Sequence, residues 1–309
     1  MDKTNRMPVF EQVFYSKLVH MIAPFEKKRK LTVVFFLITV TLLAAGLIAL
    51  AINLDFSEKS AEDAIYLYSF VILLVVLGFV WYLKKISSDT KRKILPIIFK
   101  PYNIFYTPDE SKENIQEIIE CSHIFPSFDD INTDDCFKGN IDGNDFTLQE
   151  AKITYTSGSG KNRRTVTVFQ GLVFSAGFCK DFSSTTVIKS DKGILNCLES
   201  NILKNVKLED VVFEKHFETY SEDQVEARFL LTTAFMERFL NLKLSHKSSV
   251  QAVFLDNKVN IFLSYAGDVF ELPYFSTILK PQIYKSIIKK VLELTEIINS
   301  LKINEKIGL

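Results

Sequence analysis

Few glycines and prolines interrupt this sequence, with 11 and 8 respectively among 309 residues. Such a composition leaves little room for disordered linkers and indicates a packed chain, as do the 27 phenylalanines. Neither sign of charge predominates, because 37 basic residues balance 37 acidic ones. The chain therefore lacks the overall basic field that draws nucleic acid, and we predict no nucleic-acid partner.

Cysteine is scarce and widely spaced, at Cys121, Cys136, Cys179 and Cys197. No two of these residues form a C-x-x-C pair, and no histidine completes a zinc-ligand pattern with them. Because zinc sites are usually built from such closely spaced pairs, we predict no metal site and no cofactor. The thiols are expected to be free, as in a reducing compartment.

Charge is missing from two long apolar segments, residues 31–53 and residues 64–83. About 20 apolar residues span the core of a bilayer as a helix. The first segment is longer than the apolar core of a signal peptide and follows thirty residues of chain, so we expect no cleavage. We predict a retained two-helix transmembrane hairpin over residues 31–83.

The charges around this predicted hairpin are asymmetric. The loop between the segments, residues 54–63, holds four acids and one lysine. The outer flanks are basic, and such flanks stay in the cytoplasm. We therefore predict a multi-pass protein of the inner (cytoplasmic) membrane with both termini cytoplasmic and the lipid bilayer as a partner. The basic flanking residues are Lys27, Lys28, Arg29, Lys30, Lys84, Lys85, Lys91, Arg92 and Lys93.

Neither apolar segment contains an ionisable residue, although transport pathways usually place one at membrane depth. The hairpin is therefore interpreted as an anchor, and a small oligomeric channel is the less favoured alternative. Ala45 and Ala49 form a small-xxx-small pair that would let helices associate, although they are equally typical of residues that face lipid. Self-association through the helices is a further hypothesis.

The pattern outside the membrane divides the chain into further parts. Residues 1–30 are predicted to form a cytoplasmic segment with a short amphipathic helix. Residues 84–133 are predicted to form a helical connector, broken at Pro96 or Pro101 and resuming over 109–121. The first helix is indicated by one apolar face, made of Val9, Val13, Phe14, Leu18 and Met21.

Residues 134–309 are predicted to form a cytoplasmic α+β domain with a C-terminal helix. From Cys136 the apolar residues recur with a period of two, and Asp142-Gly143 is a strong signal for a two-residue hairpin turn. A meander of four or five antiparallel strands is expected, with a further hairpin about Asp256-Asn257. A helix is expected over residues 193–206. Strands mixed with segregated helices indicate an α+β fold with helices packed on an antiparallel sheet.

The segment "SGSGKNRR" (157–164) superficially resembles a phosphate-binding loop. Such a loop requires G-x-x-x-x-G-K-[ST] between a strand and a helix. Here Tyr155 occupies the first glycine position, Asn162 follows the lysine, and strands are expected on both sides. We interpret the segment as a hairpin turn. Its basic residues are hypothesised to touch anionic lipid headgroups: Lys161, Arg163 and Arg164.

Residues 213–239 combine many titratable groups with many phenylalanines. Ser221 and Gln224 have the spacing of a capping box, which predicts a helix from Glu222. Charged and aromatic residues then separate by helical period, which favours a structural role. The alternative is an active site. The candidate cluster, functional or structural, is His216, Glu218, Asp223, Glu226 and Arg228.

Several blocks of the sequence resemble the domain-of-unknown-function 3137 family. The blocks are "DDCFKGNIDGNDFTLQEA" (134–151), "VFQGLVFSAGFCKDF" (168–182), "FEKHFETYSEDQVEARFLLTTAFMERFLNL" (213–242) and "VNIFLSYAGDVFELPYF" (259–275). The resemblance implies a bacterial membrane protein with an N-terminal helical hairpin and a soluble domain. It implies no activity, cofactor or catalytic residue.

These observations predict an uncharacterised bacterial inner-membrane protein that acts as a membrane-anchored cytoplasmic interaction or sensory module. The alternative is a membrane-associated enzyme that uses the acidic residues and His216 of the stretch 213–228. No serine or cysteine nucleophile is identifiable as a partner for this histidine, so the interaction module is favoured. The protein partner is not indicated by the sequence.

Overall fold

The structure is a computed structural model that describes residues 7–53, 59–108, 110–125, 128–141, 143–190, 203–246, 248–301 and 303. The chain forms two compact units. Met1–Ile97 and Glu271–Ser286 make the helical unit, and Ile98–Phe270 and Ile287–Leu309 make the sheet unit.

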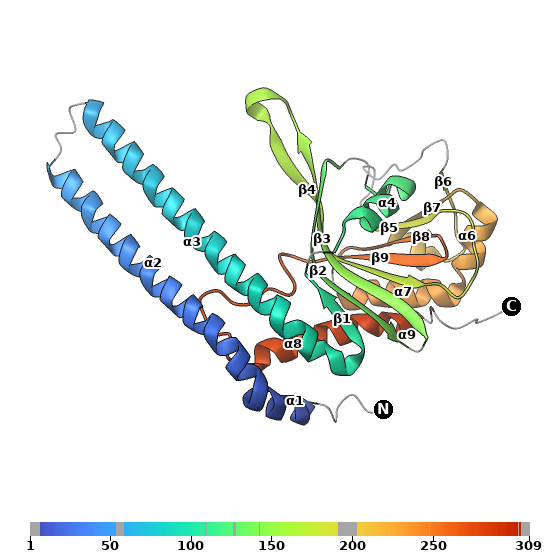
Figure 1. Ribbon diagram of the computed structural model, residues 1–309. Coiled ribbons are helices and arrows are strands. Elements are labelled where there is room, and N and C mark those ends of the chain that lie inside the picture. The colour runs from blue at the N-terminus through green and yellow to red at the C-terminus, as the bar shows by residue number, and fades with distance from the viewer. Residues whose placement is uncertain are drawn as a thin grey trace. The chain divides into compact units, whose positions relative to one another are not determined.

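Two long helices dominate the helical unit (Figure 1). The chain enters through α1 (Met7–Val13) and the π-helical turn η2 (Phe14–Leu18), continues as α2 (Val19–Asn53), and returns as α3 (Lys59–Phe99). Two stretches, Phe10–Ala49 and Asp63–Tyr102, are long and apolar enough to cross a membrane.

The apolar side chains of these helices lie largely on the surface. None of the most hydrophobic 18-residue stretch of α2 is buried, and only 6% of that of α3 is buried. Phe36 and Phe79 stack with ring centroids 3.7 Å apart, and the Tyr68 hydroxyl donates to the Leu43 carbonyl at 2.6 Å. The alanine at position 45 is exposed, and the close approach lies instead at Gly46, beside the Tyr68 ring.

The stretch predicted as a helical connector contains a strand as well as helices. Helix α3 passes through Pro96 and ends at Phe99, where the 3-10 turn η3 (Lys100–Tyr102) contains Pro101. Strand β1 (Ile104–Thr107) follows, and α4 (Glu113–Ser122) comes next.

An antiparallel sheet forms the core of the sheet unit, which confirms the α+β fold (Figure 1). Within the described residues it has nine strands in the order β1-β2-β3-β4-β9-β8-β5-β7-β6. The strands after β1 are β2 (Asp130–Ile141), β3 (Asn144–Ser157), β4 (Arg164–Gly177), β5 (Thr186–Ser190), β6 (Lys204–Asn205), β7 (Phe217–Ser221), β8 (Val250–Leu255) and β9 (Lys258–Ser264).

The hairpin prediction at Asp256-Asn257 is confirmed. Both residues have positive φ, +49° and +57°, as a type I′ turn requires, and they join β8 to β9. Gly143 also has positive φ at the β2–β3 connection, whereas its predicted partner Asp142 lies outside the described residues. Most of the helix predicted over residues 193–206 also lies outside the described residues. The prediction is wrong for the last residues of that range, because Lys204 and Asn205 form strand β6.

Helices cover both faces of the sheet. Val253 packs in a cluster with Ile115 and Ile119 of α4. The next residue, Phe254, contacts Phe235 of α7 (Thr233–His246), with ring centroids 5.6 Å apart. Since successive strand residues point to opposite faces, α4 and α7 lie on opposite sides. The other helices are α5 (Val211–Glu214), α6 (Gln224–Leu230), α8 (Pro281–Thr295) and α9 (Ile297–Leu301).

Gly171 lets β4 approach β9 more closely than any other residue type would allow. A Cβ added there would lie 2.0 Å from the Leu263 carbonyl oxygen, and φ at this residue is +155°. Backbone atoms cannot move aside without breaking the ladder between the two strands. We predict that Gly171→Ala lowers the free energy of unfolding by about 2 kcal/mol or more.

Thermal unfolding of the purified chain in detergent, followed by circular dichroism, measures this change. Gly143→Asn is the matched control, because asparagine tolerates positive φ and an added Cβ meets nothing within 4 Å there. Equal melting temperatures for Gly171→Ala and the unsubstituted chain would contradict the prediction.

Candidate functional site

The five residues of the candidate polar cluster lie on β7, α6 and the turn before β7. His216 is in that turn, where its backbone N–H donates to the Phe213 carbonyl at 2.9 Å. Glu218 is in β7 and accepts a hydrogen bond from the Tyr220 hydroxyl at 2.8 Å. Both hydrogen bonds join residues that are close neighbours along the chain, in β7 and the turn before it.

Asp223 is the N-cap of α6, and Ser221 is not. The Asp223 carboxylate accepts from the backbone N–H groups of Val225 at 2.7 Å and Glu226 at 3.1 Å. The prediction that Ser221 caps this helix is wrong, because Ser221 ends β7 and its hydroxyl pairs with that of Thr186 at 2.9 Å. A carboxylate at the N-cap satisfies free N–H groups and also interacts favourably with the helix dipole.

Glu226 fastens the loop before β5 to helix α6. Its carboxylate accepts from the backbone N–H of Ser183 at 3.0 Å and that of Ser184 at 2.6 Å, and also from the Ser184 hydroxyl. Partial burial alone would raise the pKa of Glu226, but these hydrogen bonds outweigh it and hold the pKa below its ordinary value. The charge on this carboxylate therefore serves to hold two segments together.

Arg228 binds backbone carbonyls. Its guanidinium donates to the carbonyl of Gln224 at 3.0 Å and to that of Lys207 at 3.1 Å. Glu218 and Asp223 of the same cluster accept from the Tyr220 hydroxyl and from backbone N–H groups instead. Within the described part of the chain, Asp223, Glu226 and Arg228 thus make capping and loop-fastening contacts, and the contacts of His216 and Glu218 are local ones.

A second acidic group, which sequence reasoning missed, brings Asp135, Glu150 and Asp268 together. Their carboxylate oxygens lie within 4.8 Å of one another, with the first two residues buried and the third exposed. The β2–β3 register shifts between Asp134 and Cys136, so Asp135 is the extra residue of a β-bulge, which re-aims its side chain. A bulge of this kind leaves no signal in the sequence.

Carboxylate oxygens are the ligands that hard cations prefer, but donors of the protein already use this group. The Tyr106 hydroxyl donates to Asp135, and the backbone N–H of Val269 donates to Glu150 at 2.9 Å. The arrangement therefore has a structural use in tying β1 and the segment after β9 to the β2–β3 pair.

The sheet unit also carries a polar groove of about 740 Å³ between the start of α4 and strands β2–β4. Lys138 in this groove pairs with Glu110 at 2.8 Å, and Asp145 accepts from the Asn140 amide at 2.7 Å. Its remaining polar lining includes Asn114, Asn144, Thr147, Gln149, Ser175 and Lys258.

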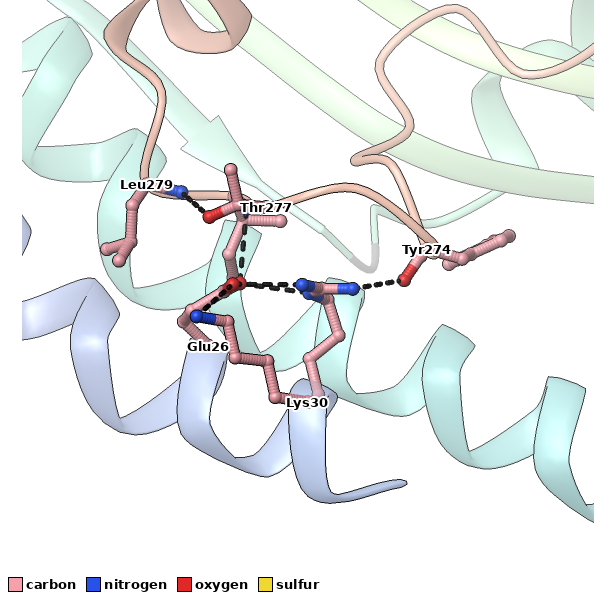
Figure 2. Close-up of polar contacts among 7 residues, drawn as sticks. Glu26, Lys30, Tyr274, Thr277 and Leu279 are labelled. Atoms are coloured by element: carbon pink, nitrogen blue, oxygen red, sulfur yellow. Dashed lines mark hydrogen bonds and ion pairs between the residues drawn. The ribbon is translucent and has the colours of Figure 1, made fainter. Parts of the chain in front are cut away.

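The most buried ion pair with described contacts lies in the helical unit, between Glu26 and Arg29 of α2 (Figure 2). Their side chains are 2% and 7% exposed. The guanidinium donates two parallel hydrogen bonds to the carboxylate, Nε to Oε2 and Nη2 to Oε1, each at 2.9 Å. Paired bonds of this kind are the strongest that an arginine and a carboxylate form.

Both members of this pair also bind the main chain of residues 274–278. Arg29 Nη1 donates to the Tyr274 carbonyl at 2.9 Å (Figure 2). The Ile278 N–H donates to Glu26 Oε2 at 3.2 Å. Burial alone would raise the pKa of Glu26, but hydrogen bonds from Arg29, Ile278 and Thr277 lower it. We call these four interacting groups, Glu26, Arg29, Tyr274 and Ile278, the clamp.

The clamp was not foreseen from the sequence, where Arg29 counted only as one of the basic residues that flank the first apolar segment. The i,i+3 spacing of Glu26 and Arg29 is a signal for an ion pair on a helix. Nothing in the sequence shows that the main chain some 245 residues later closes over it.

We predict that Arg29→Ala destabilises the helical unit strongly, by about 3–5 kcal/mol, because it leaves the buried Glu26 carboxylate without its counter-charge. Lys30→Ala is the matched control. Lys30 lies 3.7 Å from the same carboxylate but is 65% exposed, so its loss should cost about 1 kcal/mol or less. Thermal unfolding in detergent separates the two outcomes. Similar melting temperatures for both variants would refute the assignment of the clamp as a buried, paired site.

Comparison with known proteins identifies a family for the second half of the chain. Residues 167–303 match the family described as "Protein of unknown function (DUF3137)". No curated protein matches the chain. Among solved structures, the crystal structure of the mycobacterial trehalose monomycolate transport factor A, TtfA, is similar, with 12% identity, a TM-score of 0.32, and coverage of 65% of this chain and 90% of that chain. The family match confirms, over residues 167–303, the resemblance noted in the sequence.

Proposed function

We propose that this is a bacterial inner-membrane protein, anchored by α2 and α3, whose antiparallel sheet works as a cytoplasmic interaction or sensory module. The anchor is supported by large apolar side chains that face outward from these helices. Phe35 is 72% exposed, Leu42 69% and Leu67 66%. An apolar surface of this size is unfavourable in water and favourable in a lipid bilayer.

The clamp is the observation that carries the proposal. A module that senses the state of a membrane, or reports to it, needs a defined mechanical link to its anchor. The clamp provides such a link, because it holds the main chain of residues 274–278 against α2 through hydrogen bonds and one buried ion pair. A second contact supports it, since the Ser87 hydroxyl of α3 donates to Glu271.

Helix α8 connects this link to the rest of the protein. It begins at Pro281, three residues after Ile278, and runs without interruption to Thr295. Its residues up to Ser286 belong to the helical unit, and those from Ile287 belong to the sheet unit. One continuous helix thus contributes residues to both units and joins them covalently.

The enzyme alternative receives less support. It would require the carboxylates of residues 213–228 to act on a substrate. The described contacts of Glu226 and Asp223 are instead a loop fastening and a helix cap. The channel alternative would require a polar pathway through two segments that contain no Asp, Glu, His, Lys or Arg.

We predict a cytoplasmic location for both termini. A cysteine introduced as Ser60→Cys should react with an impermeant maleimide added to intact cells, because residue 60 would lie at the outer end of the hairpin. The native Cys121, which is exposed in the structure, should react only after the cells are opened. Reaction of Cys121 in intact cells would reverse the proposed topology.

We further predict that the clamp couples the hairpin to α8. The double variant Glu26→Leu/Arg29→Met replaces the ion pair by apolar side chains of similar size, a change that is often neutral for stability. It should nonetheless speed amide hydrogen exchange at Ile278 and along α8 beyond Ser286. Exchange that changes only at residues 271–280, with α8 unaffected, would show that the clamp is a local fastening and would contradict the sensory role.

A further inference from the structure

Strands β3 and β4 extend beyond the sheet as a two-stranded ribbon (Figure 1). The pairing of β2 with β3 ends at Thr154, and the pairing of β9 with β4 ends at Gly171. Beyond these points Tyr155 pairs with Val166, and Ser157 with Arg164, and no other strand of the described residues pairs with the outer ribbon on either side. Residues 155–166 therefore form a projection from the sheet unit.

The end of the ribbon is a tight, formed turn. Gly158 has φ of +86°, and a Cβ added to it would lie 2.4 Å from the Asn162 carbonyl oxygen. Gly160 also has positive φ, +57°, and begins the 3-10 turn η4 (Gly160–Asn162). The two glycines thus let the turn fold back on itself and present the residues that follow, Arg163 and Arg164, at the tip.

The charged residues of this projection are all basic. From Ala151 to Cys179 the chain has no aspartate or glutamate and has four basic residues: Lys152, Lys161, Arg163 and Arg164. Arg163 and Arg164 are exposed and make no ion pair within the described part of the chain. An acid of another segment, Asp129, binds the base of the ribbon, where its carboxylate accepts from the Thr156 N–H. Because the whole chain is neutral, this surplus is a local feature.

We propose that this basic tip, with the exposed Arg163 and Arg164, binds the phosphate groups of anionic lipids in the membrane that holds the chain. This inference rests on the proposed membrane anchor, which keeps the lipid surface at high effective concentration around the sheet unit. Guanidinium groups bind phosphate through two parallel hydrogen bonds. Each basic side chain near an anionic bilayer favours contact by about fivefold, so two arginines together favour it by roughly 25-fold. The tip gives the sheet unit a second, reversible attachment to the bilayer.

The test uses the full chain in lipid nanodiscs, made either of phosphatidylcholine alone or of phosphatidylcholine mixed with phosphatidylglycerol. Trypsin cleaves after Arg163 and Arg164, and mass spectrometry follows the rate. In anionic discs this cleavage should be at least about tenfold slower than in neutral discs, and high salt should restore it. Cleavage after Lys207, in an exposed loop of the same unit, is the internal control and should not depend on the lipid.

A second experiment identifies what the tip touches. A photo-cross-linking residue in place of Ser159 should capture labelled phosphatidylglycerol, and Arg163→Gln/Arg164→Gln should reduce this capture about tenfold. The matched control, Lys204→Gln/Lys207→Gln, removes two exposed lysines elsewhere on the sheet unit and should leave capture unchanged. Equal cleavage in both kinds of disc, or capture of an acidic protein in preference to lipid in native membranes, would overturn the proposal.

Failure of the anchor is distinguishable from failure of the tip. A chain that enters discs and resists alkaline extraction, yet is cleaved equally in both lipids, retains its anchor and refutes the tip. A chain that does not enter discs refutes the anchor. Flotation of that chain with anionic and with neutral vesicles then tests the tip alone, and equal flotation would refute it.

Discussion

A buried carboxylate is tolerable in a protein only when a counter-charge and hydrogen-bond donors surround it, and Glu26 meets this requirement through Arg29 and the Ile278 N–H. The requirement works in both directions. The pair needs the main chain of residues 274–278 to complete its hydrogen bonds, and that main chain has in the pair a defined place to bind. Residues 274–278 are thereby held to α2, the first long helix, although about 245 residues separate them from it along the chain.

The surrounding structure makes this interaction effective. Apolar side chains of the same unit are almost fully buried. Ile22, Leu83 and Ile278, for example, are each less than 5% exposed. The low polarity of such surroundings strengthens hydrogen bonds to charged groups, and it also raises the cost of losing one partner. The clamp therefore favours one arrangement of residues 274–278 on α2 strongly, and loss of any one of its partners is costly.

The sheet unit shows a different use of charge. Its carboxylates at Asp223 and Glu226 satisfy backbone N–H groups, and Arg228 satisfies backbone carbonyls. Loops and short helices expose many such groups, so a unit rich in connections needs many side chains to pair with them. A concentration of titratable residues in a sequence is thus as compatible with capping and fastening as with catalysis.

Local patterns in the sequence determined much of this protein. Residues 31–53 and 64–83 carry no charge and became the C-terminal part of α2 and most of the first half of α3. The period of two after Cys136 became β2–β4, and Asp256-Asn257 became a hairpin turn, because both depend on residues that are neighbours along the chain.

Tertiary structure alone decided the rest. The position of the N-cap at Asp223 rather than Ser221 depends on where β7 ends, which its pairing with β5 sets. The β-bulge at Asp135 and the approach of β4 to β9 at Gly171 depend on the register between strands. The clamp depends on the fold bringing Tyr274 to Arg29 across 245 residues, and the burial that makes their ion pair strong exists only after the chain has folded.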